Sequence, residues 1–280
     1  MATVDVVVVS YNSADVLGAC LDSIVAERGV ASVTVVDNAS ADGTAALACA
    51  RLGVAVIETG RNLGFAAAAN RGAAAGNARF VLFLNPDATI VGGAVETMAS
   101  AMNADPGLAL VGPSVRNPDG SVYPSARQFP TMTQAGAHAF LGLMRPNNRF
   151  SRRYKFPEVP DCISGTALLV RRDLFDAIGG FDERYFMYVE DVDLSWRIRT
   201  AGGRIAVVPD AEVVHLIGGS SEGAPYRMIA AHSRSLFRFA VTTTTGVRRA
   251  LLPVVALALA GRTLLAWVHR SLRGRPHAAP

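Results

Sequence analysis

The sequence predicts an α/β protein with a Rossmann-like, mainly parallel sheet, and two observations lead to this fold class. In the first half of the chain, short apolar runs rich in valine and isoleucine alternate with stretches whose apolar residues recur at helical spacing. Polar residues directly follow each of the first four apolar runs, as expected where parallel strands end at one rim of a sheet. Half of the 280 residues are hydrophobic, which is enough for a substantial core.

The elements of the first half follow from this alternation. We expect that Pro86 stops the fourth strand, because proline has no N–H to give to a sheet. Ser13 is expected to cap the first helix. The expected strands are 4–9, 33–36, 55–57 and 80–85, and the expected helices are 14–28, one that opens at 44, one that ends near 76, and 92–104.

The second half is predicted to continue the sheet. A strand at 108–111 precedes a hairpin whose turn is Asn117-Pro-Asp-Gly120. The segment 128–158 has poor periodicity and is interpreted either as a mobile acceptor-side flap or as an ordinary surface loop. Further elements are a strand at 162–170, a helix at 171–178, an aromatic loop at 181–188, a helix from 189, and strands at 205–208 and 213–215.

Charge and cysteine content exclude several classes of protein. The formal net charge is +4, with arginines concentrated at 145–155 and 248–275, which favours an anionic partner such as a nucleotide diphosphate or a phospholipid surface. Aromatic and basic residues do not interleave, so we expect no nucleic-acid partner. Cys20, Cys49 and Cys162 are few and widely spaced, which argues against a disulfide framework or a zinc site and indicates a reducing, cytoplasmic compartment. No basic segment precedes the first strand, so no signal peptide is expected.

Four polar clusters are predicted to share the rim at the carboxyl ends of the strands, where open α/β sheets bind ligands. Each cluster alone is equally consistent with a turn or a helix cap, but the four together indicate a nucleotide site. The carboxylate of Asp37 suits a ribose hydroxyl or a base N–H, and Arg61 suits a phosphate. The clusters are Tyr11 and Asn12, Asp37 and Asn38, Arg61 and Asn62, and Asn85 and Asp87.

Other nucleotide sites are disfavoured. A dinucleotide site of the NAD type needs a glycine-rich turn after the first strand, and Ser10 to Asp15 has no glycine. The same absence argues against a nucleotidyltransferase, and no Gly-Lys-Ser/Thr sequence of a P-loop occurs. Asn85 and Asp87 instead place two oxygen ligands in a rigid turn, which suits a hard divalent cation that also holds phosphate oxygens.

Three carboxylates fall in the first turn of the helix predicted from 189 onwards. They can complement the helix dipole, with Asp193 paired to Arg197, and a carboxylate there can also accept a proton from an incoming hydroxyl. The acids are Glu190, Asp191 and Asp193. His215 ends the last predicted strand and is either structural or a metal ligand.

The C-terminal region has two predicted helices. The first, 226–241, is amphipathic and basic, and the second, 250–268, is apolar but interrupted by Arg262. A clean membrane span needs about 20 apolar residues, so we favour a helix that lies in the membrane interface, or else one that packs on the core or on a second copy of the chain.

These motifs resemble family 2 glycosyltransferases, which have the GT-A fold. Four motifs of the first half carry the resemblance to the donor-binding region, and two of the second half resemble the acceptor-side segment. The motifs are Val-Val-Ser-Tyr-Asn12, Val-Val-Asp-Asn-Ala-Ser40, Arg-Asn-Leu-Gly-Phe65 with Asn70-Arg-Gly72, Leu-Asn-Pro-Asp87, Gly-Gly-Phe-Asp182 and Glu190-Asp-Val-Asp-Leu-Ser-Trp-Arg197.

The resemblance implies a domain organisation and a set of site residues. A GT-A domain would cover 1–221, with a nucleotide-sugar-binding half at 1–112 and an acceptor-side half at 113–221, followed by a helical extension at 222–280. Asp191 would be the general base, assisted by Glu190. The nucleotide-sugar site would use Ser10, Tyr11, Asn12, Asp37, Asn38, Arg61, Asn62, Gly64, Asn70, Asn85 and Asp87, and the acceptor side Gly165, Asp182 and Trp196.

The resemblance also implies a divalent cation, Mn²⁺ or Mg²⁺, on the donor diphosphate. Asp87 and His215, the latter followed by a Gly/Ser-rich loop, would hold it. Asn85 stands where many family members have an aspartate, so it is a weaker ligand. Imidazole suits Mn²⁺ better than Mg²⁺, and the identity of the metal stays open.

The implied reaction is an inverting sugar transfer by single displacement. The motifs resemble bacterial rhamnosyltransferases of the cell envelope, which implies dTDP-rhamnose as donor and a lipid-linked or polysaccharide acceptor at the inner face of the cell membrane. Alternatives are a UDP- or GDP-sugar donor (galactofuranose or mannose) or a non-catalytic scaffold that binds nucleotide sugars. The sequence leaves open whether the chain forms a homo-oligomer.

Overall fold

A computed structural model describes residues 4–129, 159–216 and 225–273. The chain divides into two compact units. The first comprises Met1–Phe129, Phe150–Phe186 and Glu190–Glu222, and the second Pro130–Arg149, Met187–Val189 and Gly223–Pro280. The segment 130–158, read above as a flap or loop, and the Gly/Ser-rich loop after Leu216 lie outside the described residues.

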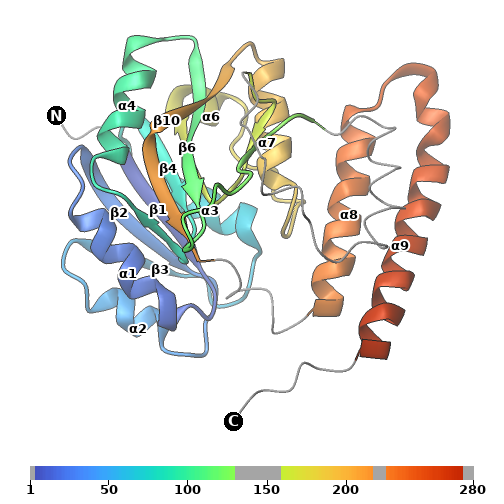
Figure 1. Ribbon diagram of the computed structural model, residues 1–280, viewed down its shortest axis with the longest axis horizontal. Helices are drawn as coiled ribbons and strands as arrows, with labels where there is room; N and C mark the ends of the chain where they lie inside the picture. The colour runs from blue at the N-terminus through green and yellow to red at the C-terminus, as the bar shows by residue number, and fades with distance from the viewer. Residues whose placement is uncertain (1–3, 130–158, 217–224, 274–280) are drawn as a thin grey trace. The chain divides into compact units, whose positions relative to one another are not determined.

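The first unit contains the predicted α/β sheet, with eight strands in the order β3-β2-β1-β4-β9-β6-β10-β5 (Figure 1). Strands β1 to β4 are parallel, as are β6 and β10, whereas β9 runs antiparallel to β4 and β6, and β5 runs antiparallel to β10. The strands are β1 Val4–Ser10, β2 Val30–Asp37, β3 Val54–Glu58, β4 Phe80–Leu84, β5 Ala88–Ile90, β6 Leu108–Arg116, β9 Ala167–Arg171 and β10 Arg204–His215.

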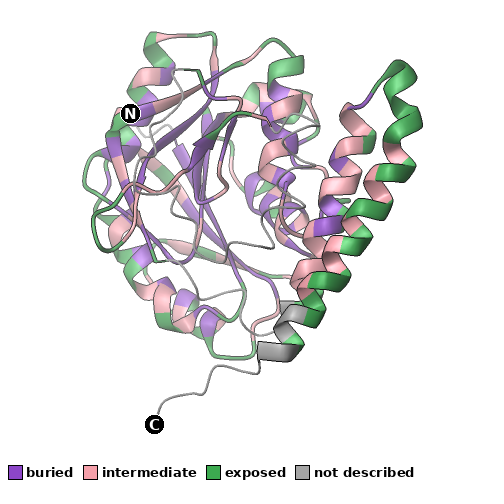
Figure 2. Ribbon diagram, turned by 45° about the vertical axis from the view of Figure 1, so that its right-hand side comes forward, coloured by how far each residue is buried: buried purple, intermediate pink, exposed green. Residues whose placement is uncertain are grey.

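Two hydrophobic cores cover the two faces of this sheet. Side chains alternate along β4, so that Phe80, Leu82 and Leu84 enter one core and Val81 and Phe83 enter the other. Buried residues therefore concentrate in the strands (Figure 2). The first core holds α1 Ala14–Val25, α2 Thr44–Cys49 and α4 Ala94–Ala104, and the second holds α3 Phe65–Ala74, α6 Arg172–Ala177 and α7 Glu190–Thr200.

The register of the parallel strands confirms the predicted rim. Ser10 pairs with Asp37, and Asp37 pairs with Glu58, so β1, β2 and β3 end side by side. Val8 pairs with Leu84, which brings the end of β4 to the same edge. The segments that follow these strands are thereby collected at one edge of the sheet.

Three expected elements differ from the structure. The expected strand at 162–170 is two strands in different sheets, because Ser164 to Thr166 bend between β8 Cys162–Ile163, which pairs with β7 Ala126–Arg127, and β9. The two strands expected at 205–208 and 213–215 form one long strand, β10, whose register against β6 shifts between Val208 and Glu212. Pro86 ends β4 as predicted, but the short strand β5 after it was not foreseen.

The predicted hairpin near Asn117 is reduced to a turn and a single bridge. Gly120 N donates to Asn117 O at 2.9 Å, which confirms the turn. Beyond it the chain pairs only through an isolated bridge between Arg116 and Val122. Pro124 follows this bridge closely, and proline has no N–H with which to extend a ladder.

Besides Met187–Val189, the described part of the second unit is an antiparallel pair of helices, α8 Pro225–Thr243 and α9 Leu252–Arg273, joined by a 3₁₀ turn at Gly246–Leu251. Arg262 of α9 bonds to His232 Nδ1 at 3.2 Å, and Thr263 Oγ1 donates to Ser233 Oγ at 2.8 Å. Among the described residues, the stretch Gly246–Val268 is long enough and apolar enough to cross a membrane, judged by length and composition. Only 6% of its apolar window is buried.

Candidate active site

Asp37 has a carboxylate oxygen without a hydrogen-bond partner at the rim of the sheet, among the described residues. Its side chain is 2% exposed at the end of β2, and Oδ2 accepts a hydrogen bond from Ser40 N at 2.9 Å. Oδ1 is buried and has no partner among the described residues. Because an unpaired buried carboxylate oxygen is costly, this atom is suited to receive a hydrogen bond from a bound ligand. Ser10, at the end of β1, is fully buried beside it, and its Oγ is 3.5 Å from Val36 O.

Asn12 joins the loops after β1 and β2. It has a positive φ of 50°, which asparagine tolerates better than most residues. Its N–H donates to Ser40 Oγ at 2.9 Å, and its Oδ1 accepts from Ala41 N at 2.8 Å. These hydrogen bonds hold the loop that carries Tyr11, whose side chain is 40% exposed. The sequence places Asn12 among nucleotide contacts, and the structure shows its side chain fixing this loop.

Ser13 does not cap α1 as expected. Its hydroxyl donates to Tyr11 O at 3.2 Å. Ala14 N, at the helix start, instead donates to Asp42 Oδ2 at 3.0 Å. The carboxylate from the next loop replaces the serine because the two loops are already held together at Asn12.

Asn38 organises the loop after β3. Its Nδ2 donates to Asn62 Oδ1 and Gly64 O, both at 3.1 Å, and its Oδ1 accepts from Leu63 N at 2.8 Å and from Thr59 Oγ1 at 3.3 Å. Both ends of the Asn38 side-chain amide and the amide oxygen of Asn62 are thus occupied by protein partners. Arg61, between them, is exposed and is the member of this cluster that can reach an anionic ligand.

Gly64 and Asn70 connect the donor half to the segment that precedes α7. Gly64 has φ of 83°, and a Cβ there would lie 2.2 Å from Phe186 O. Asn70 exchanges two bonds with the backbone of Phe181, each 2.9 Å long. The side chain of Asn70 therefore holds this loop in place.

Asp87 and His215 form a buried pair at the end of β4 and β10. Asp87 Oδ1 lies 3.1 Å from His215 Nε2, and the two residues are 7% and 8% exposed. His215 Nδ1 has no partner among the described residues, and the edge of its ring packs with Tyr123. The described residues contain no group of three or more His, Cys, Asp or Glu that could hold a metal. A cation here would thus depend on this pair, on Asn85 and on ligand oxygens.

Glu190 and Asp191 begin α7 with different hydrogen bonding. Asp191 Oδ2 accepts from Gly165 N at 2.9 Å, and Oδ1 accepts from its neighbour Val192 N at 2.8 Å. Burial raises the pKa of Asp191, and these two donors oppose that effect. Glu190 is buried, and its Oε2 has no partner among the described residues.

Glu190 and Asp191 differ in how well their surroundings stabilise the charged carboxylate. Burial, reinforced by the charge of Asp191, raises the pKa of Glu190 to about 8. Two adjacent buried carboxyls cannot both ionise easily, and the backbone donors favour charge on Asp191. The backbone donors therefore favour Asp191 as the group that carries the negative charge and Glu190 as the group that holds the proton, which is the arrangement that a base at Asp191 requires.

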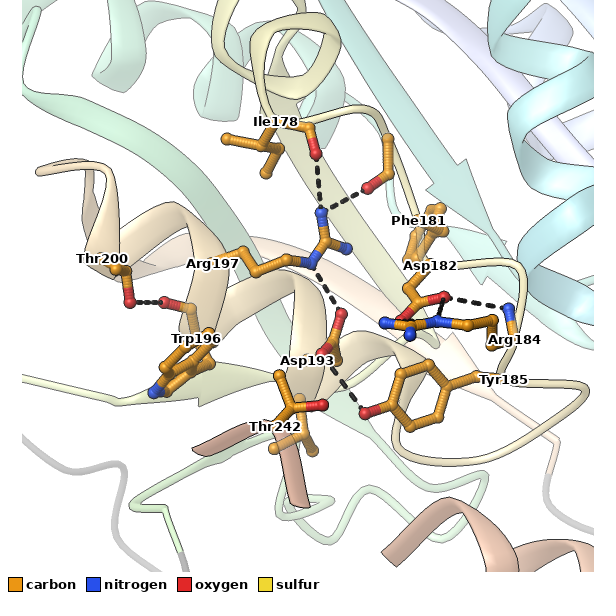
Figure 3. Close-up of polar contacts among 12 residues, drawn as sticks. Ile178, Phe181, Asp182, Arg184, Tyr185, Asp193, Trp196, Arg197, Thr200 and Thr242 are labelled. Atoms are coloured by element: carbon orange, nitrogen blue, oxygen red, sulfur yellow. Dashed lines mark hydrogen bonds and ion pairs between the residues drawn. The ribbon is translucent and has the colours of Figure 1, made fainter. Parts of the chain in front are cut away.

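Asp193 anchors α7 through the polar contacts that Figure 3 shows with Tyr185 and Arg197. It pairs with Arg197 at 2.7 Å, as predicted, and accepts from Tyr185 Oη at 3.3 Å. Arg197 also donates to Ile178 O and Gly180 O at 3.1 and 2.7 Å. This network holds the loop before α7 against the helix, which fixes the position of Asp191.

The other predicted acceptor-side residues lie around α7. Gly165 contacts Asp191, as described. Asp182 forms an ion pair with the exposed Arg184 at 2.7 Å. Trp196 is half-buried on the helix. Sequence reasoning missed Thr166 and Tyr123. The small residues of 164–166 were one available signal for Thr166, whereas nothing in the sequence indicated that Tyr123 would pack on His215.

A single bend joins the metal-binding candidates to the base candidate. Asn85 N donates to Thr166 O at 2.9 Å, and the adjacent Gly165 N donates to Asp191. The Asn85-Pro-Asp87 turn and Asp191 are therefore attached to consecutive residues. This arrangement suits a transfer in which a diphosphate and a nucleophile lie on neighbouring sides of one reacting centre.

Comparisons with known proteins identify the family. The profile described as "Glycosyl transferase family 2" matches residues 5–179. The N-acetylglucosaminyl-diphospho-decaprenol L-rhamnosyltransferase of Mycobacterium tuberculosis is 40% identical over 81% of this chain and 80% of its own length. The rhamnosyltransferase WbbL of Escherichia coli is 31% identical over 41% of this chain and 43% of its own length.

A solved structure shows the same fold. The mannosyltransferase PcManGT of Pyrobaculum calidifontis, in complex with GDP-Man and Mn²⁺, has a TM-score of 0.58 at 20% identity and covers 98% of this chain and 76% of its own. The chain belongs to glycosyltransferase family 2. It is a glycosyltransferase with a GT-A fold followed by C-terminal helices, as the resemblance of its motifs implied.

Proposed function

We propose that this enzyme transfers L-rhamnose from dTDP-rhamnose to a hydroxyl of a lipid-linked cell-envelope glycan, with inversion at the anomeric carbon. The relative from Mycobacterium tuberculosis, which covers most of the chain, supports both the sugar and the lipid-diphosphate acceptor by its name. The observation that carries the proposal is the attachment of Asp191 and of the Asn85-Pro-Asp87 turn to the consecutive residues Gly165 and Thr166.

In the proposed mechanism, Asp191 accepts the proton of the acceptor hydroxyl as it attacks the anomeric carbon. Gly165 N and Val192 N donate hydrogen bonds to this carboxylate, which favour its ionised form and orient it before the reaction. Glu190, protonated at neutral pH, donates a hydrogen bond to the acceptor sugar. One displacement inverts the configuration, so no covalent nucleophile is needed.

The donor would lie along the rim. Asp37 Oδ1 accepts from the nucleoside, and Arg61 neutralises phosphate. Asp87 and His215, with Asn85, would hold a divalent cation, and a bound cation stabilises the negative charge that develops on a departing diphosphate. The unpartnered, buried Nδ1 of His215 fits this role, because rotation of the ring can present either nitrogen.

The C-terminal helices would hold the enzyme at the inner face of the cell membrane. Arg262 and Thr263 occupy the side of α9 that faces α8. Val254, Leu257 and Leu264 are 62%, 74% and 60% exposed. An amphipathic helix with one apolar exposed side is suited to lie in the interface, and the exposed Arg248 and Arg249 would meet anionic headgroups.

Thermal unfolding in the presence of dTDP-, UDP- and GDP-sugars, each with and without Mn²⁺, tests the donor. A ligand that binds only the folded protein raises the melting temperature, so we expect a Mn²⁺-dependent shift with dTDP-rhamnose. A shift with GDP-mannose or a UDP-sugar alone would replace the proposed donor. Binding without any transfer to acceptors would support the scaffold alternative.

A further inference from the structure

A short ribbon beside Asp191 carries an arginine that the proposed mechanism does not use. Strands β7 and β8 pair antiparallel, with Ala126 opposite Ile163 and Arg127 opposite Cys162. The ribbon continues through Ser164 N, which donates to Ser125 O at 2.6 Å, to Gly165, whose N–H holds Asp191. Arg127 is therefore attached to the same backbone that positions the base.

The two faces of this ribbon differ in character. Ala126 and Ile163 are 0% and 1% exposed and belong to the second hydrophobic core. Because side chains alternate along a strand, Arg127 and Cys162 project from the opposite face. The charges of Asp191 and Arg127 both act on the Cys162 thiol, whose pKa burial raises to about 12. The face that carries Arg127 is thus the face near Asp191.

The guanidinium of Arg127 has no carboxylate partner in the described part of the chain. Its Nε donates to Pro124 O at 2.9 Å, which leaves both terminal nitrogens without a protein partner there. Its neighbour Arg199, by contrast, pairs with Asp161 at 3.1 Å. Ser125, two residues before Arg127, has a buried hydroxyl, 2% exposed, that also lacks a partner among these residues, whereas Arg127 itself is exposed.

These features define a small anion site on the acceptor side of the base. A guanidinium that is fixed through Nε offers parallel N–H donors that match two oxygens of a phosphate, and a nearby hydroxyl can add a third bond. The donor diphosphate is already assigned to Arg61 and to the cation that Asp87 and His215 would hold. A second phosphate group, next to the base, belongs to the molecule whose hydroxyl the base deprotonates.

We propose that Arg127, assisted by Ser125, binds the diphosphate of the lipid-linked acceptor sugar and so orients its hydroxyl toward Asp191. The proposal rests on the proposed function, in which the acceptor is a glycosyl diphosphate. Arg127 is a positioning residue, and it distinguishes phosphate-bearing acceptors from neutral glycosides of the same sugar.

Two synthetic acceptors test this role. One is N-acetylglucosamine linked through a diphosphate to a short prenyl chain, and the other is the matched alkyl glycoside without phosphate. Loss of charge-assisted hydrogen bonds predicts that Arg127→Ala raises the KM of the diphosphate acceptor by about 10- to 100-fold. The KM of the alkyl glycoside and the binding of the donor should stay unchanged. Arg127→Lys should recover part of the lost affinity for the diphosphate acceptor, because lysine restores the positive charge but not the paired N–H donors of the guanidinium.

Arg199→Ala is the matched control, since it removes a nearby positive charge that is already paired with Asp161. It should affect both acceptors alike. An equal effect of Arg127→Ala on the two acceptors would overturn the proposal.

Calorimetric binding of the sugar-free prenyl diphosphate, in EDTA to suppress the metal-dependent donor site, separates this proposal from the proposed function. Arg127→Ala should weaken this binding by about tenfold or more. Undiminished binding to the variant, or no binding to the wild type, would refute the anion site. Arg127-dependent binding in an enzyme that transfers no sugar to either acceptor would refute the proposed function and leave the anion site intact.

Discussion

His215 Nε2 lies 3.1 Å from Asp87 Oδ1, and strand pairing sets this contact, because His215 is opposite Ala88 in the ladder of β5 and β10. The residue after Asp87 thus fixes the histidine beside it. A long strand from the acceptor half completes a pair that the donor half begins.

The pair predicts metal-dependent activity that is sensitive to either partner. We expect that His215→Ala raises the Mn²⁺ concentration for half-maximal transfer by about 10- to 100-fold, and that Asp87→Ala abolishes activation. Titration of activity with Mn²⁺ measures both effects. Asp119→Asn, an exposed acid bonded to Ser121, is the control. If the two site variants had the same Mn²⁺ dependence of activity as the wild type, Asp87 and His215 would not be metal ligands.

Asp191→Asn should lower kcat by about 10²- to 10⁴-fold, because an amide cannot accept the proton. Donor binding should be unaffected, since Asp191 contacts Gly165 and not the rim. Single-turnover transfer and thermal shifts with dTDP-rhamnose report the two quantities. Asp173→Asn, which changes an exposed acid in the first turn of α6, should have little effect. Full transfer by Asp191→Asn would show that another group is the base.

The raised pKa of Glu190 predicts a pH dependence of stability. The folded protein keeps this proton up to about pH 8, whereas the ordinary pKa of a glutamate side chain is 4.5. Since the folded state binds more protons in this interval, the stability that Glu190 contributes is fully present below pH 4.5 and is lost as the pH rises through about 8.

Glu190→Gln should therefore flatten the fall in the free energy of unfolding between these two pH values. Urea unfolding at several pH values measures the slope. Glu96→Gln, an exposed acid in the first turn of α4, should leave the slope as in the wild type. Equal slopes for wild type and Glu190→Gln would show that Glu190 ionises normally.

Gly64→Ala should destabilise the first unit more than Gly53→Ala does. Both glycines have positive φ, 83° and 78°, but an added Cβ meets Phe186 O at 2.2 Å only at position 64, whereas nothing lies within 4 Å at position 53. We expect a loss of about 1 kcal/mol for Gly53→Ala from conformation alone, and clearly more than about 2 kcal/mol for Gly64→Ala. Denaturant unfolding compares them, and equal losses would contradict the close approach to Phe186.

The exposed side of α9 predicts binding to anionic vesicles. Leu257→Asp with Leu264→Asp should abolish co-flotation with vesicles that contain phosphatidylglycerol, because charge would replace apolar contacts with the interface. Leu52→Asp changes a leucine that is 95% exposed on the first unit and should not alter flotation. Equal flotation of the double variant and the wild type would assign the apolar side to another partner.

The sequence predicts the rim better than it predicts the chemistry of individual residues on it. Strand ends follow from local patterns, so Asp37, Arg61 and Asp87 are found at one edge as expected. Hydrogen bonding depends on contacts across the fold. Asn38 and Asn70 carry the same side-chain chemistry as a ligand contact, but both ends of their amides are occupied by other loops.

The acceptor half shows the same limit for backbone structure. The run 162–170 is strand-like in sequence, with small residues in its first half, and its division at Ser164 to Thr166 depends on partners that lie far along the chain, at Ser125 and Asn85. The spacing of apolar residues within the run carries no information about such distant partners. It is this division that places Gly165 on Asp191, so the feature most important for the base was also the one that local patterns could not give.

Met187 to Val189 belong to the unit of the C-terminal helices, although they directly precede Glu190 in the chain. Ser235 Oγ donates to Met187 O at 3.0 Å, and the Tyr188 ring packs edge-on against His232. Tyr188 and Val189 both have positive φ, 67° and 71°, which is an unfavourable conformation that needs support from its surroundings. The C-terminal helices therefore do more than anchor the chain. Cutting the chain at 222 would free the residues that lead into α7, and we expect such an enzyme to be impaired even toward water-soluble acceptors.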